Sequence, residues 1–340
     1  MKRSRRTTRI PDSHPGLFDA IDGAEPFGMA DIVAEAVERI RAREAAEAVE
    51  SLALPRDATE RAEKLMFVSF GSGSSGNCAY IGTRSAGVLI DAGVDADAVR
   101  GGLRNNGIDF GSAVKGIILT HDHGDHVRYA YPLLRRTDKR LWATPKALAG
   151  ILRRHNISRR IKEYHQPIYK EFEFAVGPLA ITPFETSHDG TDNVGFSVRF
   201  GAETFVVATD MGYATERALH YMRGATVLMV EANYDAHMLA TGRYPQYLQA
   251  RIRGERGHMD NEDTAARLAE LWTPAMHHVF LCHLSHDNNT PEMALSAAAA
   301  GLARAGAQVM DTAGAAFARR HGMVSLSALP RFDASPLYLF

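Results

Sequence analysis

THDHGDH, residues 120–126, is the most informative stretch of the chain, and it follows the apolar, strand-like run VKGIILT. It places four possible metal ligands within six residues: His121, His123, Asp125 and His126. A single histidine is usually structural. Three imidazoles and a carboxylate in one loop are costly unless a divalent cation pairs with their lone pairs. Residues i and i+2 of an extended segment can converge on one ion while the following Asp-His pair turns toward a second. The stretch therefore predicts metal binding.

Short β-rich runs alternate with helical stretches from Met66 onward, which indicates an α/β or layered α+β domain. The expected strands are MFVSF, CAYIG, GVLIDAG, VKGIILTH, RLWATP, LAITPFETSH, VGFSVRF, TFVVATDMG, VLMVEAN and HVFLCH. The expected helical stretches are 125–136, 145–155, 214–223, 261–272 and 290–306. Many strands end in a residue that can bind a metal: Asp91, His121, His188, Asp210, Glu231 and His283. Loops from one edge of a sheet can meet at one point, so His188, Asp210 and His283 are further candidate ligands.

The composition is that of an ordinary globular protein. In 340 residues, 39 Lys and Arg face 40 Asp and Glu, so nucleic-acid binding would need a local basic patch. The hydrophobic content of 45% excludes a disordered, collagen-like or disulfide-scaffold chain. Two cysteines, Cys78 and Cys282, favour a reducing, cytoplasmic setting. No apolar run approaches the roughly 18 residues that span a bilayer, and the basic start lacks the apolar region of a secretory signal. We expect neither secretion nor membrane insertion.

Three segments are expected along the chain. Residues 1–27 form a flexible basic arm, because five basic residues are mixed with Pro and Gly in a composition that cannot build a core. Residues 28–64 form an amphipathic helical extension, and residues 65–340 form the main domain. The apolar stripe of the extension is expected to dock on the main domain; self-association or binding of a protein partner is the alternative. The stripe comprises Met29, Ile32, Val33, Ala36, Val37 and Ile40.

The Gly/Ser-rich segment GSGSSG at 71–76 matches the letters of a dinucleotide-binding fingerprint. That motif requires the last glycine to open a helix whose N-terminus faces the pyrophosphate. Here Gly76 runs into the extended run NCAYIG instead, which argues against dinucleotide binding. We expect a connection between two strands, which either lines an anion site or is only a tight turn.

The pattern H-x-H-x-D-H followed by His, Asp and His resembles the metallo-β-lactamase superfamily. Within it, the motifs follow the order of the YycJ/WalJ-type exonuclease family over roughly 66–340: SFGSGSSGNCAYIG, VLIDAG, ILTHDHGDHV, VEANYD, YPQYLQARI, GHMDN and HLSHDNNTPEMA. The resemblance implies a four-layered αββα sandwich with a dinuclear site at one edge. The family usually has His where this chain has Tyr234 and Ser where it has Asp260, and both changes could alter substrate contacts or proton transfer. The first 64 residues lie outside the resemblance.

The resemblance also implies roles for the candidate ligands. His121, His123 and His188 would hold one divalent ion, either Zn²⁺ or Mn²⁺, and Asp125, His126 and His283 the second, with Asp210 between them. Asp125 is accordingly expected to be essential for hydrolysis. Asp91 would orient a ligand histidine, with a purely structural role at the strand end as the alternative.

Further residues are candidates for contact with the substrate. His258, in GHMDN, would contact a phosphate or donate a proton to the leaving oxygen; alternatively it is a helix-start residue that packs near the site. The other candidate substrate-binding residues are Ser74, Ser75, Asn77, Asn233, Asn288 and Asn289. Asn side chains at turns more often satisfy backbone groups. His286 is expected to support the site or to be exposed. Two basic clusters, at 135–140 and 153–162, are candidate nucleic-acid contacts, although such charge runs are usually solvated faces.

The resemblance and the ligand pattern together predict a dinuclear metallohydrolase that acts as a DNA exonuclease, with 5′-to-3′ polarity implied by the resemblance. The first alternative keeps the metal site but hydrolyses a small phosphodiester, lactone or thioester. The second is a non-catalytic module that docks DNA or protein.

Overall fold

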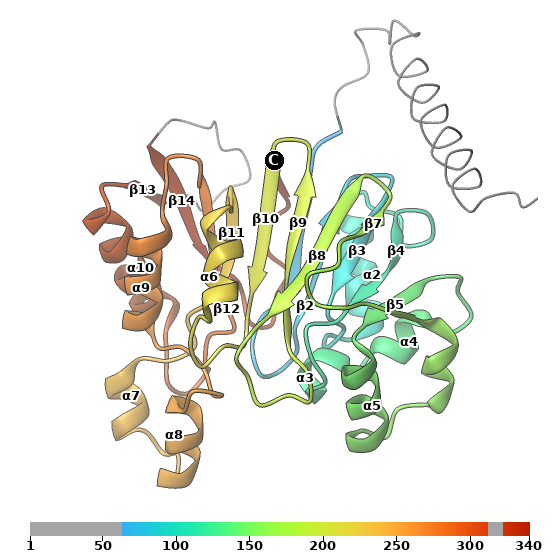
Figure 1. The fold of residues 1–340 in the computed structure, drawn as a ribbon, viewed down its shortest axis with the longest axis horizontal. Helices are drawn as coiled ribbons and strands as arrows, with labels where there is room; N and C mark the ends of the chain where they lie inside the picture. The colour runs from blue at the N-terminus through green and yellow to red at the C-terminus, as the bar shows by residue number, and fades with distance from the viewer. Residues whose placement is uncertain (1–62, 312–321) are drawn as a thin grey trace, which may run out of the picture. The chain divides into compact units, whose positions relative to one another are not determined.

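The computed structural model describes residues 63–311 and 322–340, which fold into two β-sheets with helices on their outer faces (Figure 1). This arrangement confirms the predicted four-layered αββα sandwich. The predicted basic arm at 1–27 lies outside the described residues, as does the predicted helix at 28–64 except for its last two positions. Among the described residues, no helix is both long and apolar enough to cross a membrane.

The first sheet has seven strands in the order β15-β1-β2-β3-β4-β5-β6. Their bounds are β1 (Met66–Gly71), β2 (Cys78–Gly82), β3 (Gly87–Ile90), β4 (Val114–Ile118), β5 (Arg140–Ala143), β6 (His165–Pro167) and β15 (Tyr338–Leu339). Strands β1, β2 and β3 pair antiparallel, whereas β3, β4, β5 and β6 are parallel. The Gly/Ser-rich segment joins β1 to β2, as expected for a connection between strands.

The second sheet has eight strands in the order β13-β14-β12-β11-β10-β9-β8-β7. Their bounds are β7 (Phe174–Val176), β8 (Leu179–Glu185), β9 (Val194–Phe200), β10 (Glu203–Ala208), β11 (Val227–Glu231), β12 (His278–Cys282), β13 (Gln308–Asp311) and β14 (Met323–Ala328). Strands β10, β11 and β12 are parallel to one another. Their carboxyl ends therefore lie at one edge of the sheet.

Helices cover the outer face of each sheet. On the first sheet these are α2 (Ala96–Asn105), α4 (Ala130–Leu134) and α5 (Pro145–Arg154); on the second they are α6 (Glu216–Arg223), α9 (Asn261–Leu271) and α10 (Pro291–Arg304). The short helices α3 (Gly124–Val127), α7 (Ala236–Thr241) and α8 (Gln246–Arg253) lie at one end of the sheets, and a 3-10 helix spans Arg159–Tyr164 (Figure 1).

Side-chain alternation along the strands builds three apolar layers. In β1, Val68 faces the helices of its own sheet, whereas its neighbour Phe67 faces the second sheet. In β11, Val230 packs against α6 and α9, whereas Met229 faces the first sheet. Because successive residues of a strand point to opposite faces, strands buried on both sides are apolar throughout. This explains the continuous apolar runs in the sequence.

All ten predicted strands are present, and four of the five helical stretches correspond to α5, α6, α9 and α10. The predicted helix at 125–136 is instead divided into α3 and α4, because Tyr129 leaves the helical conformation between them. Helices α2, α7 and α8 were not predicted.

Three strand ends of the site carry non-glycine residues in the left-handed region of backbone space. Asp91 after β3, Asp210 after β10 and His283 after β12 have φ values of 60°, 53° and 55°. This conformation is uncommon for residues with a side chain, and it turns the chain sharply where each strand ends. All three side chains consequently point into the same region.

A close approach of backbone holds the loop after β4 in place. A Cβ atom at Gly93 would lie 1.5 Å from the carbonyl oxygen of Asp125, so only glycine fits there. The amide of Asn77 donates to this same carbonyl at 2.8 Å, and the amide of Ala92 donates to the carbonyl of His126 at 2.7 Å. The β1–β2 connection and the end of β3 thus clamp α3, which carries two of the candidate ligands.

Candidate metal centre

Three histidine rings converge at the end of β4 and β8. His121 Nε2 lies 3.1 Å from His123 Nδ1, and His188 Nε2 lies 3.2 Å from that same nitrogen. The remaining ring nitrogens are engaged elsewhere: His121 Nδ1 with Thr120 Oγ1 at 3.0 Å, His188 Nδ1 with the carbonyl of Gly257 at 2.9 Å and His123 Nε2 with Asp189 at 3.2 Å. Each ring is thereby oriented so that one nitrogen faces the other two rings. Convergent nitrogens of this kind fit a cation.

A second group joins Asp125, His126 and His283. Asp125 Oδ2 lies 3.6 Å from His126 Nε2 and 3.5 Å from His283 Nε2. His283 Nε2 is buried, and among the described residues it has no hydrogen-bond partner apart from the 3.5 Å approach of Asp125. A buried imidazole nitrogen without a partner is unfavourable, so this atom too is suited to hold a cation.

Asp210 lies between the two groups. Its Oδ2 is 3.5 Å from His126 Nε2, and its carboxylate approaches His283 at 3.4 Å and His188 at 3.9 Å. His121, His126 and Asp210 can also place one donor atom each around a common point. All seven ligands predicted from the sequence are therefore brought together in overlapping groups.

The electrostatics of the two groups differ. Burial, reinforced by His126, holds the pKa of His121 well below its usual range, and burial also lowers the pKa of His188. A lowered pKa favours the neutral imidazole, which is the form that binds a metal. Burial would also lower the pKa of His126, but Asp91, Asp210 and Asp125 raise it to about 9. The surplus of carboxylate charge around His126 is the environment that a divalent cation would neutralise.

Asp91 contacts both the strand end and a candidate ligand. Its Oδ2 lies 2.8 Å from His126 Nδ1, and its Oδ1 accepts from the amide of Thr120 at 2.9 Å. The carboxylate is buried at 2% exposure. These contacts fix the His126 ring so that its Nε2 faces Asp125 and Asp210.

Glu231 is a residue of the site whose role the sequence analysis did not assign. Its buried carboxylate lies 2.6 Å from His258 Nδ1 and 3.1 Å from His283 Nδ1, and it accepts from the amide of Met211 at 2.8 Å. Burial would raise the pKa of Glu231, but His258 and His283 lower it. The carboxylate therefore links His258, at the start of the α9 region, to the ligand His283. Its position at the end of VLMVE was the available signal.

Asp189 and Arg251 form a second connection that the sequence did not reveal. Asp189 Oδ1 lies 3.2 Å from His123 Nε2, and Asp189 Oδ2 accepts from Arg251 Nε at 2.8 Å and from its Nη2 at 2.6 Å. The hydrogen bond from His123, together with Arg251, holds the pKa of Asp189 well below its usual range. Helix α8 is thus tied through one carboxylate to a candidate ligand.

Ser74 and Ser75, predicted to bind substrate, lie in the β1–β2 connection. Arg331, 256 residues further along the chain, donates from Nη2 to Ser74 Oγ at 3.0 Å and from Nε to Ser75 Oγ at 3.1 Å. Ser74 remains exposed at the site, whereas Asn77 is buried below it. Asn77 Nδ2 donates to the carbonyl of Gly73 at 3.0 Å and lies 3.0 Å from His126 Nε2.

The other predicted substrate contacts, Asn233, Asn288 and Asn289, are buried. Asn233 Nδ2 donates to the carbonyl of His283 at 2.7 Å and lines the pocket. Asn289 Nδ2 donates to the carbonyls of Ala232 and Asn233 and to Asn261 Oδ1. Asn288 contacts Ser285. Most of these bonds satisfy backbone carbonyl groups of the turns behind the site.

The two positions that depart from the family pattern pair with each other. Tyr234 and Asp260 form an isolated parallel bridge, and Asp260 caps α9 by accepting from the amide of Asp263 at 2.7 Å. Serine is an equally good capping residue, so the change preserves the helix start. Burial, together with Asp260, raises the pKa of Tyr234 to about 12.

The predicted basic clusters are exposed except for Lys139, and a few of their side chains have partners within the protein. Lys139 is buried and donates to the carbonyl of Val114 at 2.6 Å, so it does not contribute to an exposed patch. Arg154 approaches Asp122 at 3.6 Å and Arg153 donates to Thr191 at 3.3 Å. His286 is exposed, as expected.

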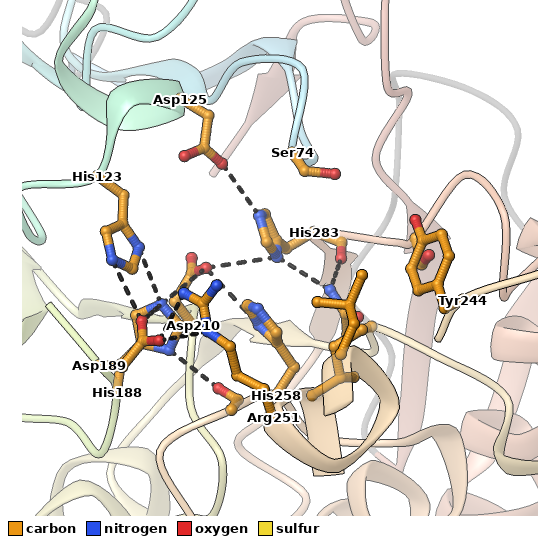
Figure 2. Close-up of a pocket in the computed structure, with 15 residues that line it drawn as sticks. Ser74, His123, Asp125, His188, Asp189, Asp210, Tyr244, Arg251, His258 and His283 are labelled. Carbon is orange, nitrogen blue, oxygen red and sulfur yellow. Dashed lines mark hydrogen bonds and ion pairs between the residues drawn. The ribbon is translucent and has the colours of Figure 1, made fainter. Parts of the chain in front are cut away.

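A cavity of about 250 Å³ opens over the candidate ligands. Figure 2 shows His123, Asp125, His188, Asp210 and His283 directed toward it, with His283 between Asp125 and Asp210. The walls come from the β1–β2 connection, the segment after β12 and the region of α8. The wall residues are Ser74, Asp189, Asn233, Tyr244, Leu248, Arg251, Ile252, Gly257, His258 and Ser285.

Comparison with known protein families identifies the domain. Residues 87–283 match the family model described as the β-lactamase superfamily domain. This region contains all seven predicted ligands.

The proteins that resemble the chain include two exodeoxyribonucleases and a solved structure with the same fold. It is 32% identical over 236 residues to exodeoxyribonuclease YycJ of Bacillus anthracis, covering 68% of this chain and 86% of the relative. It is 28% identical over 224 residues to exodeoxyribonuclease WalJ of Streptococcus pneumoniae, covering 66% and 82%. The crystal structure of the metallo-β-lactamase fold protein YhfI from Bacillus subtilis shares the fold, with a TM-score of 0.56, 13% identity and coverage of 82% and 100%.

The contact between Asp189 and His123 generates a prediction about metal affinity. Replacement of Asp189 by Ala frees the His123 ring and the Arg251 side chain, and loss of such an outer partner typically weakens metal binding about 10- to 100-fold. Competition with a chromogenic chelator measures this change. Asp97→Asn, which alters an exposed carboxylate on α2 that pairs with Arg100, is the matched control. Unchanged affinity in Asp189→Ala would show that Asp189 does not position His123.

Proposed function

Because the chain belongs to the β-lactamase superfamily and, within it, to the YycJ/WalJ group of metal-dependent hydrolases, we propose that it is a DNA exonuclease with a dinuclear metal centre. The observation that carries the proposal is the convergence of the seven predicted ligands in overlapping groups of possible metal donors, below a cavity lined by His258 and Ser74. One of these groups also includes Glu231 and His258. The names of the two relatives support DNA as substrate. We propose 5′-to-3′ polarity because the resemblance to the YycJ/WalJ-type exonuclease family implies it.

The two ligand groups fit two divalent ions, Zn²⁺ or Mn²⁺. His121, His123 and His188 would hold the first ion and Asp125, His126 and His283 the second, with Asp210 shared. When bound, such a pair of ions supplies Lewis-acid charge and lowers the pKa of the attacking water. Asp91 and Asp189 orient His126 and His123 from behind. Burial of Asp210 at 2% exposure keeps bulk water from screening its charge.

His258 is placed to act on the leaving group. Its Nδ1 is engaged by Glu231 Oε1 at 2.6 Å, which leaves Nε2 for a substrate in the cavity that His258 lines. A carboxylate behind an imidazole fixes the tautomer and stabilises the protonated ring. We propose that His258 contacts the scissile phosphate or donates a proton to the leaving oxygen. Ser74 and Asn233 line the cavity beside it and are proposed substrate contacts.

The roles of residues 1–27 and 28–64 rest on the sequence alone. We propose that the basic arm at 1–27 contributes to DNA binding. The extension at 28–64 would dock on the domain or serve self-association or a protein partner.

An assay on labelled DNA tests the proposed activity. Metal-free protein is supplied with Mn²⁺ or Zn²⁺ and given end-labelled single- and double-stranded DNA, with bis(p-nitrophenyl) phosphate as a small ester. We expect stepwise loss of terminal nucleotides, and none from Asp125→Ala, because this variant loses a donor of the second group. Cleavage of the small ester without any action on DNA ends would contradict the exonuclease and favour a small-molecule hydrolase.

The position of His258 predicts that it affects turnover rather than metal content. His258→Ala should lower kcat by about 10²- to 10⁴-fold, the usual contribution of a general acid, with metal content unchanged. His286→Ala, which alters an exposed histidine in the segment after β12, should leave kcat unchanged. Loss of metal in proportion to activity in His258→Ala would instead make His258 a ligand.

A further inference from the structure

Helix α8 forms an apolar wall of the cavity although it has no buried residue of its own. Leu248 and Ile252 are four residues apart, so they lie on the same face of the helix, and both line the cavity. Tyr244, just before the helix, lines the same cavity. We call Tyr244, Leu248 and Ile252 the α8 wall.

The apolar side chains of α8 are not part of the protein core. Leu248 and Ile252 are half-buried, but they belong to none of the three apolar clusters that the described residues form. Leucine and isoleucine normally gain stability by packing in a core. Here they are held beside a cavity whose floor is charged, so the side chains face the volume that a substrate would occupy.

The α8 wall is fixed by polar contacts at both ends. Arg251 binds Asp189 through two nitrogens, and Asp189 contacts the ligand His123. Tyr244 Oη donates to Asp287 Oδ2 at 3.0 Å, which holds the ring at the rim of the cavity (Figure 2). The carbonyl of Ile252 accepts from the amide of His258 at 2.9 Å. The wall is therefore preorganised relative to both the candidate ligands and His258.

The cavity combines two kinds of surface at short range. Its floor holds His123, Asp125 and Asp210, which suit a phosphate together with cations, and one side carries the apolar α8 wall. A volume of about 250 Å³ lies slightly below the usual range for small-molecule sites and is on the scale of one unit of a polymer. A group with a flat apolar face attached to a phosphodiester matches both surfaces.

We propose that the α8 wall is the subsite for the terminal nucleobase of a single DNA strand, which packs on Leu248, Ile252 and Tyr244 while its phosphodiester lies over the candidate ligands. This inference rests on the proposed exonuclease function and specifies how its substrate is held. Packing on apolar and aromatic side chains tolerates any base, because every base has a π-face. A paired terminal base would have to leave the duplex before it reached the wall.

A comparison of two substrates tests the subsite in the unmodified enzyme. Single-stranded oligonucleotides carry either a normal nucleotide or an abasic residue at the terminal position, in separate 5′ and 3′ series. We expect the abasic end to raise KM for its own removal by about fivefold or more in the series that is degraded, the lower limit for one base stacked on a protein. Equal KM values for the two ends would overturn the proposal without affecting the exonuclease assignment.

Variants of α8 localise the effect. In Leu248→Ser/Ile252→Ser, which keeps Tyr244, KM for the normal end should rise toward that of the abasic end. The difference between the two substrates should therefore shrink while metal content stays unchanged. Tyr247→Ser is the matched control, because Tyr247 lies on the same helix but is 77% exposed and outside the cavity lining. An abasic penalty that persists undiminished in the double variant would place the base elsewhere. Hydrolysis of the small ester with no degradation of DNA would overturn the exonuclease and this subsite together.

Discussion

The crowding of imidazoles and carboxylates at the end of two sheets is the constraint on which the rest of the site depends. Ring nitrogens of His121 and His188 lie 3.1 and 3.2 Å from the same nitrogen of His123, and Asp125 and Asp210 lie nearby. In a buried environment this arrangement is favourable only when opposite charge compensates it. Burial lowers the pKa of His121 and His188 on one side, whereas nearby carboxylates raise the pKa of His126 and His283 on the other. In the proposed dinuclear centre, two divalent cations would compensate both groups at once.

The sandwich brings these charged and polar side chains together at its edge, whereas the fold itself is stabilised by apolar layers away from the site. Three apolar layers hold the sheets and helices together, and the candidate ligands follow the ends of β4, β8, β10 and β12 outside those layers. The left-handed conformations of Asp91, Asp210 and His283 each cost about 1–3 kcal/mol, a strain that the surrounding structure must offset. Strain concentrated at three strand ends of one site is typical of a functional centre.

Much of the fold and of the ligand set could be predicted because the signals are local. Apolar runs predicted the strands, and THDHGDH places four possible donors within six consecutive residues. Contacts between distant segments could not be predicted in this way. Glu231 meets His258 27 residues later, Asp189 meets Arg251 62 residues later, and Arg331 reaches Ser75 across 256 residues. Nothing in the sequence around these positions indicates their partners.

Helix α8 is another feature that could not be predicted from the sequence. It is short, it buries no residue, and its two apolar side chains give no strong helical pattern, so it was not predicted. Its importance appears only when Leu248 and Ile252 are seen beside the cavity. Asn77 illustrates the converse, since the sequence suggested substrate contact and the structure places its amide beneath the site, against Gly73 and His126.

The number of metal ions per chain tests the central claim most directly. Elemental analysis of protein purified without chelator, followed by titration of metal-free protein with Mn²⁺ or Zn²⁺, gives this number. The seven predicted ligands, which lie in overlapping groups, predict two equivalents per chain, because they are too many for one catalytic ion with an open position. A stoichiometry of one that excess metal does not raise would contradict the account.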